Sequence, residues 1–186
     1  MKRFFSFFLI VCIAGCKEVS FENPQPEGKK ELTSIPKNIR GKYLVVGEDG
    51  QPSKDTVIIT SNGYRFGYFD PIERKAHNEK YEERSISDSL VIKHYKGYLF
   101  VNVNEDPEWI LRILKQEKNG DLTYMTLEEK NIDFNVYLEK LSSQIRIDSM
   151  TTDKETLYQI DPDPNELVNI IELGYVSKTR LVKVKD

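Results

Sequence analysis

The sequence predicts a mainly β (α+β) fold, a curved antiparallel sheet or barrel of about eight or nine strands with one or two short helices. Three observations support this prediction. From Ile39 onward, apolar and polar residues alternate in segments rich in β-branched and aromatic side chains, which is the pattern of half-buried strands. Near the C-terminal end, two segments carry apolar residues at helical spacing instead. Dipeptides suited to the positive φ angles of tight turns separate the strand-like segments, namely Asp49-Gly50, Asn62-Gly63 and Asn119-Gly120.

The alternating segments predict the strands in chain order. They span residues 42–47, 56–60, 64–69, 89–95, 98–104, 109–117 and 121–127, and a last strand spans 178–184. The charged stretch 82–89 predicts a solvated loop, because it lacks an apolar face to bury.

The clearest hairpin joins residues 109–117 to residues 122–127 through the turn Lys118-Asn119-Gly120-Asp121. Alternation along its two strands predicts one shared apolar face. That face should hold Trp109, Leu111, Ile113, Leu122, Tyr124 and Thr126. Trp109 is the only Trp of the chain, and we expect it in the core and not on a binding surface.

Two segments predict helices, residues 133–145 and residues 164–173. The second has the better-marked ends. Asp163 and Glu166 have the spacing of a capping box around a proline, which suits the first helical turn. Leu167, Ile170 and Ile171 form its apolar stripe, and Gly174 can end the helix.

The first residues have the three parts of a bacterial secretory signal. Met1-Lys2-Arg3 is basic, and residues 4–13 are apolar except for Ser6. This run is too short for a membrane-spanning helix, which needs about 20 residues. Ile13-Ala14-Gly15-Cys16 resembles the lipobox of bacterial lipoproteins, with Ile in place of the more common Leu. The resemblance implies cleavage after Gly15 and a lipidated Cys16.

Three regions are expected on this basis: residues 1–15 as a lipoprotein signal peptide, 16–38 as a lipidated N-terminus and Pro-containing tether, and 39–186 as a single β-rich globular domain. The prolines of the tether favour an extended chain. An alternative stays open, in which this segment packs against the domain with Phe21 as its anchor.

The stretch Phe21 to Gly28, with Ile35-Pro36 and Gly41-Lys42-Tyr43 after it, resembles the opening of an uncharacterised group of Bacteroidota (flavobacterial-type) lipoproteins. This resemblance implies a location and no activity. A second resemblance is to lipocalin-like barrels, which begin with Gly-x-Trp on the first strand and carry a late Arg near it. Gly41-Lys42-Tyr43 and Arg180 are the matching residues here, with Tyr in place of Trp.

Composition and motifs argue against several kinds of site. With 27 basic and 30 acidic residues, the chain lacks the positive footprint of a nucleic-acid-binding protein. The two histidines, His77 and His94, are too few and too far apart for a zinc site. Asp161 to Glu172 has oxygen donors at calcium-loop spacing but lacks the glycine that the turn requires, so helix capping is the expected role. We therefore predict no catalytic residue, no metal site and no cofactor.

The sequence thus predicts a membrane-anchored envelope lipoprotein with a non-enzymatic domain that binds a partner or an apolar ligand. Its contact with the lipid bilayer is expected through acylated Cys16. Lys17 after the lipidated residue favours the outer membrane, and whether the domain faces the periplasm or the surface stays open. The alternatives are a structural or accessory subunit of an envelope assembly and, less favoured, an envelope hydrolase.

Overall fold

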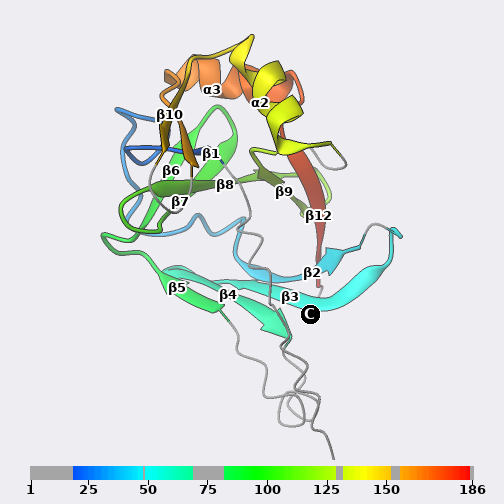
Figure 1. Ribbon diagram of the computed structural model, residues 1–186. Coiled ribbons are helices and arrows are strands. Elements are labelled where there is room, and N and C mark those ends of the chain that lie inside the picture. The colour runs from blue at the N-terminus through cyan, green and yellow to red at the C-terminus, as the bar shows by residue number, and fades with distance from the viewer. Residues whose placement is uncertain (1–18, 48, 69–81, 129–131, 152–155, 185–186) are drawn as a thin grey trace, which may run out of the picture.

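The computed structural model describes residues 19–47, 49–68, 82–128, 132–151 and 156–184. This part of the chain is mainly β, with twelve strands and two short helices. Nine strands form one antiparallel sheet, rolled into a nearly closed, barrel-like shape (Figure 1). They are β2 (Gly41–Val46), β3 (Pro52–Ile59), β4 (Gly63–Tyr68), β5 (Glu82–Ser85), β6 (Leu90–Tyr95), β7 (Tyr98–Asn104), β8 (Trp109–Gln116), β9 (Leu122–Thr126) and β12 (Ser177–Lys183). The predicted mainly β fold with short helices is confirmed.

The strand order of this sheet is β5-β4-β3-β2-β12-β9-β8-β7-β6. The last strand, β12, lies between β2 and β9 and pairs antiparallel with both, so it joins the first and second halves of the sheet. The two edge strands, β5 and β6, follow one another in the chain. A backbone bridge between Ser87 and Leu90 lies in their connection.

The central strands are apolar on both faces. In β7, every residue except the last is buried. Leu99, Val101 and Val103 point into the barrel, and Tyr98 and Phe100 point outward. The residues that face inward form the inner core, which comprises Ile35, Ile39, Tyr43, Ile59, Leu90, Ile92, Leu99, Val101, Val103, Leu114, Leu122 and Leu181.

A second layer covers the outward face of β7, β8 and β9 (Figure 1). It contains helix α2 (Phe134–Ser142), helix α3 (Pro164–Glu172) and a small sheet with the order β1-β11-β10. The strands of this sheet are β1 (Val19–Ser20), β10 (Ile147–Thr151) and β11 (Thr156–Ile160). Together they form the outer core, which includes Phe21, Phe100, Leu111, Ile113, Met125, Leu141, Leu167 and Ile170.

Helix α3 begins as predicted. The Asp163 carboxylate accepts hydrogen bonds from the amides of Asn165 and Glu166 at 2.6 and 2.9 Å. The Glu166 side chain accepts the Asp163 amide at 2.8 Å, which completes the capping box. Gly174 follows with a φ of 90°, where a residue without Cβ ends a helix at little conformational cost.

The N-terminal segment from Val19 to Ile39 packs against the domain, which is the second of the two alternatives that the sequence leaves open. Phe21 is fully buried in the outer core. Its amide and carbonyl groups pair with those of Trp109, each at 2.9 Å. Further along, the segment passes the free edge of β6, where Leu32 donates its amide to the Ile92 carbonyl at 2.8 Å.

Two buried polar side chains hold the middle of this segment. Asn102, on the outward face of β7, is fully buried. Its side chain accepts the Gln25 amide at 2.6 Å and donates to the Gln25 carbonyl at 2.8 Å, so it pairs with the backbone as a neighbouring strand would. The buried ammonium of Lys93 donates to the carbonyls of Pro24 and Pro26 at 2.7 and 3.2 Å.

The predicted hairpin exists, but the predicted matching face was wrong. The Glu117 amide donates to the Asp121 carbonyl at 2.9 Å, so the loop holds three residues, 118–120, and not four. A shift of one residue exchanges the two faces of a strand. The structure therefore pairs Ile113 with Met125 and Leu114 with Tyr124. Leu122 and Tyr124 pack toward the inner core.

Trp109 lies at the start of β8, where its side chain is half-buried. It packs against the outer core, as expected, and does not line the cavity inside the barrel. Its backbone pairing with Phe21 gives it a second role, because it fixes the start of the N-terminal segment.

Two further predictions were wrong. The residues Glu82–Ser85, predicted as loop, form the edge strand β5, whose side chains are mostly exposed; the polar composition concealed it. Gly63 does not supply a positive φ. It allows close approach instead, because a Cβ at this position would clash with the Arg84 carbonyl.

We predict that Asn102→Ala releases the N-terminal segment from β7. The substitution leaves the amide and carbonyl of Gln25 buried without partners, which costs about 1–3 kcal/mol. Chemical denaturation should show this loss, and hydrogen exchange should show faster exchange at Gln25 than in the parent. Asn135→Ala, at an exposed position on α2, is the control and should change stability by less than about 0.5 kcal/mol. Unchanged exchange at Gln25 would contradict this account of the segment.

Candidate functional site

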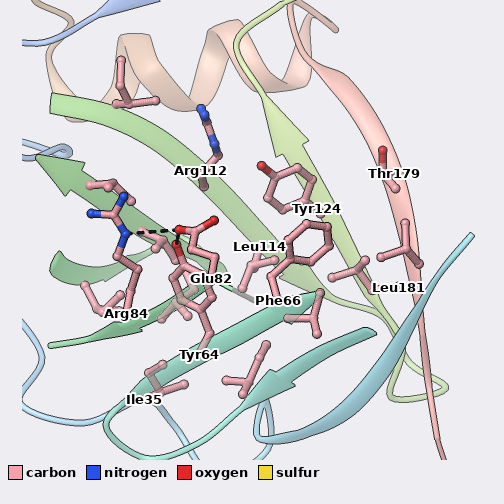
Figure 2. A pocket seen from close by; sticks show the side chains of 18 of the residues that line it. Ile35, Tyr64, Phe66, Glu82, Arg84, Arg112, Leu114, Tyr124, Thr179 and Leu181 are labelled. Carbon is pink, nitrogen blue, oxygen red and sulfur yellow. Dashed lines mark hydrogen bonds and ion pairs between the residues drawn. The ribbon is translucent and has the colours of Figure 1, made fainter. Parts of the chain in front are cut away.

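The barrel encloses a cavity of about 490 Å³. Small-molecule sites occupy roughly 300–1,000 Å³, so a ligand of modest size fits. Most of the wall is aliphatic and comes from both halves of the sheet and from the N-terminal segment (Figure 2). The aliphatic residues are Ile35, Val45, Val57, Ile59, Ile92, Leu99, Val101, Val103, Ile110, Leu114 and Leu181.

The alternation of each strand places these side chains in the cavity. On β8, Ile110 and Leu114 point inward, whereas Leu111 and Ile113 belong to the outer core. On β3, Val57 and Ile59 line the cavity. The cavity is therefore the space on the inner side of the sheet that the side chains of the inner core leave unfilled.

One side of the cavity is polar and exposed; we call it the mouth and define it by Tyr64, Phe66, Glu82, Arg84 and Glu105. Glu82 and Glu105 have side chains 46% and 54% exposed, and Phe66 is 40% exposed. The aliphatic residues of the remaining wall are buried or half-buried. The exposed residues of the lining therefore all lie in the mouth.

The polar residues of the mouth form one network, and Figure 2 shows its part around Tyr64, Glu82 and Arg84. The Tyr64 hydroxyl donates to Glu82 Oε1 at 2.8 Å, and Arg84 Nε donates to the same oxygen at 3.2 Å. Arg84 Nη2 donates to Glu105 Oε1 at 3.0 Å. This last contact connects the edge strand β5 to the loop after β7, the strand next to the other edge.

Burial and the Glu82 carboxylate both change the ionisation of this network. Burial, followed by the hydrogen bond to Glu82, raises the pKa of the Tyr64 hydroxyl well above its ordinary value of 10.0. Burial alone would lower the pKa of Arg84, but Glu82 and Glu105 outweigh it and raise that pKa. Tyr64 therefore stays a hydrogen-bond donor and Arg84 stays a cation.

The N-terminal segment closes another side of the cavity. Ile35 lines the cavity, and Ile39 lies beside it in the inner core. Asn38 and Gln116 exchange two hydrogen bonds, at 2.6 and 2.7 Å. The Tyr43 hydroxyl donates to the Ile39 carbonyl at 2.6 Å. These contacts fix the segment to β2 and β8.

The residues that carry the lipocalin-like resemblance lie next to this closure. Tyr43 is fully buried, and burial, followed by the negative charge of Asp121, raises its pKa to about 12. The cation near its ring is Lys183, with Nζ 5.7 Å from the ring centre. Arg180, the residue expected there, pairs with Asp121 at 2.7 Å instead. The cation over the Tyr43 ring is thus Lys183 and not Arg180, and the resemblance itself stays a prediction.

The other residues singled out in the sequence fall outside this site. Cys16 and His77 lie outside the described residues, and His94 is exposed on β6. Asp163 caps α3, in agreement with the capping prediction. Within the described ranges, no group of three or more His, Cys, Asp or Glu side chains could hold a metal ion.

Sequence reasoning missed the cavity residues, because they come from all nine strands of the large sheet and from the N-terminal segment. A weak local signal was present at the mouth. Tyr64 and Phe66 alternate on β4, and Glu82 and Arg84 alternate on β5. Each pair points to one face of its strand, but only the fold brings the two pairs together.

Comparison of the chain with known protein families, with curated proteins and with solved structures finds no match. In the described part of the chain, neither helix has the length and apolar content that crossing a membrane requires.

We predict that Asp121→Asn weakens the fold near neutral pH and matters less in acid. Burial alone would raise the pKa of Asp121, but hydrogen bonds from the Lys183 amide, Arg180 and Asn119 outweigh it and hold that pKa below its ordinary value of 3.8. A carboxyl with a lowered pKa stabilises the fold above its unfolded pKa, near 3.9, and this stabilisation is lost as the pH falls through the folded pKa.

Denaturation of the Asp121→Asn variant should show a loss of about 1–3 kcal/mol near neutral pH. The difference from the parent should shrink below about pH 4. Asp88→Asn, at an exposed position, should show no such pH dependence. A difference that stays constant across this range would contradict the assignment.

Proposed function

We propose that the chain is an envelope lipoprotein whose β-rich domain binds an apolar ligand in the barrel cavity without catalysing a reaction. The observation that carries the binding role is the aliphatic wall around about 490 Å³ of space. The signal-like residues 1–15 and the lipobox that ends at Cys16 support the anchoring role. Lys17 favours an outer-membrane location.

The size of the cavity favours a ligand site over a packing defect. Protein interiors are packed as densely as organic crystals, and voids much larger than a water molecule are few. Each methylene group that leaves water for an apolar site contributes about 0.8 kcal/mol. A ligand with an alkyl chain should therefore bind more tightly with each added carbon until the cavity is filled.

The polar contacts at the mouth suit orientation of a ligand. Ligand pockets commonly combine apolar walls with a few placed polar groups. Among the described residues, the carboxylates of the lining are Glu82 and Glu105, and both form ion pairs with Arg84. Neither carboxylate is therefore placed to act as a general acid or a general base. This pairing supports binding over an envelope hydrolase.

We predict that Val57→Trp blocks the cavity. The indole would project from β3 into the space that the ligand needs. The probe is N-phenyl-1-naphthylamine, an uncharged apolar dye that fluoresces in apolar sites. Its affinity for residues 17–186 should fall by at least about tenfold, which corresponds to about 1.4 kcal/mol. Val45→Trp, on the neighbouring strand β2, is a second blocking variant.

Val136→Trp, on the exposed face of α2, is the matched control and should bind the dye like the parent. Circular dichroism and thermal unfolding should show that each variant keeps the β-rich fold. Dye binding that all three variants retain, or that the parent lacks, would overturn the binding role.

We also predict that Cys16→Ser abolishes lipid attachment. The thiol is the group that a lipobox modifies, and Ser offers no thioether. Cells that express the variant should accumulate unprocessed precursor and should not incorporate labelled palmitate into it. Labelled, processed protein from the variant would refute the anchoring role, and co-fractionation of the parent with the inner membrane would refute the outer-membrane location.

A further inference from the structure

The mouth of the cavity carries an excess of negative charge. Glu82, Arg84 and Glu105 are joined by ion pairs of 3.2 and 3.0 Å. One guanidinium against two carboxylates leaves one formal negative charge in this group. Glu82 uses Oε1 for both Tyr64 and Arg84, and Glu105 uses Oε1 for Arg84.

Two aromatic side chains, Tyr64 and Phe66, lie beside Glu82 on the strand paired with it. Tyr64 and Phe66 enter the lining from β4, and Tyr124 enters it from β9 (Figure 2). Among the described residues, Phe66 is one of three large apolar side chains that are exposed, and it alone of the three lines the cavity. The face of an aromatic ring attracts a cation, and cages of aromatic rings recognise quaternary ammonium groups.

The second cation of the lining, Arg112, lies on β8. Its Nη1 donates to the Leu111 carbonyl of its own strand at 3.2 Å. In the view of Figure 2, the Arg112 side chain points away from Glu82. Its charge therefore lies toward the backbone of β8, apart from the Glu82–Arg84–Glu105 group.

The two parts of the site impose two requirements on a ligand. The aliphatic wall disfavours any polar group that enters it without a hydrogen-bond partner, so the buried part should be a hydrocarbon. A carboxylate or phosphate head at the mouth would meet the like charge of Glu82 and Glu105. A positive head would meet opposite charge and the ring faces together.

We propose that the cavity takes a single-chain amphiphile with a positively charged ammonium head, its alkyl chain inside the barrel and its head at Glu82, Glu105 and the aromatic rings of the mouth. This proposal rests on the binding role proposed above and specifies the ligand class.

The test compares two amphiphiles that share a nine-carbon alkyl chain and differ in head charge, nonyltrimethylammonium and decanoate. Isothermal titration calorimetry on residues 17–186, at concentrations below those at which either forms micelles, gives both affinities. The cation should bind at least about tenfold more tightly. This preference should shrink between about 0.15 M and about 1 M salt, because the screening length falls from about 8 Å to about 3 Å.

Substitutions at the mouth should remove the preference without removing apolar binding. In the double variant Glu82→Gln, Glu105→Gln, the cation should lose its advantage, so that decanoate binds as tightly or more tightly. Circular dichroism and thermal unfolding should show that the double variant keeps the β-rich fold. Glu172→Gln, a charge change of the same kind on the exposed face of α3, is the matched control and should keep the full preference.

The outcomes separate the two proposals. Decanoate that binds the parent as tightly as the cation, or dye binding with neither amphiphile bound, would overturn the ammonium proposal and leave the apolar binding role standing. A parent chain that binds neither the dye nor either amphiphile would overturn both. A preference for the cation that survives in the double variant would also overturn the ammonium proposal, because the mouth would not select the head.

Discussion

Strands β7 and β8 carry apolar residues on both faces. Each face must be covered by other parts of the chain to exclude water, and this requirement determines the rest of the architecture. Burial of each large aliphatic side chain stabilises the fold by about 1.5–3 kcal/mol relative to exposure. One cover is the layer of α2, α3 and the small sheet over the outer core. The other is the sheet itself, which bends so that β2 to β4 face the inner side of β7 and β8.

The second cover is incomplete, and the cavity follows from that. The inner core is filled near Ile39, Tyr43 and Leu122, which do not line the cavity. Toward Tyr64 and Glu105 the two halves leave space that side chains do not fill. Backbone pairing of nine strands fixes this separation, so the walls cannot collapse on one another.

The sequence predicted most of the strands and both helices, because alternation and capping are local signals. It missed β1, β5, β10 and β11, where polar or short segments become strands only through pairing with neighbours. The predicted register of the hairpin was wrong by one residue. The prediction places Asp121 in the loop, whereas its carbonyl accepts the Glu117 amide across the two strands. The cavity was not predictable, since its wall depends on strand order. Polyproline-like composition also favoured a free tether, whereas the buried side chains of Phe21, Asn102 and Lys93 hold the segment on the domain.

The central claim is that the inner and outer faces of the same strands have different roles, ligand contact and packing. Methyl-resolved NMR during titration with N-phenyl-1-naphthylamine tests this claim most directly, because β7 and β8 carry methyl groups on their inner faces and β8 carries them on its outer face too. The account predicts large shift changes at Leu99, Val101 and Leu114, which line the cavity, and small changes at Leu111 and Ile113 in the outer core. Changes confined to the outer-core methyls, or equal on both faces, would contradict it.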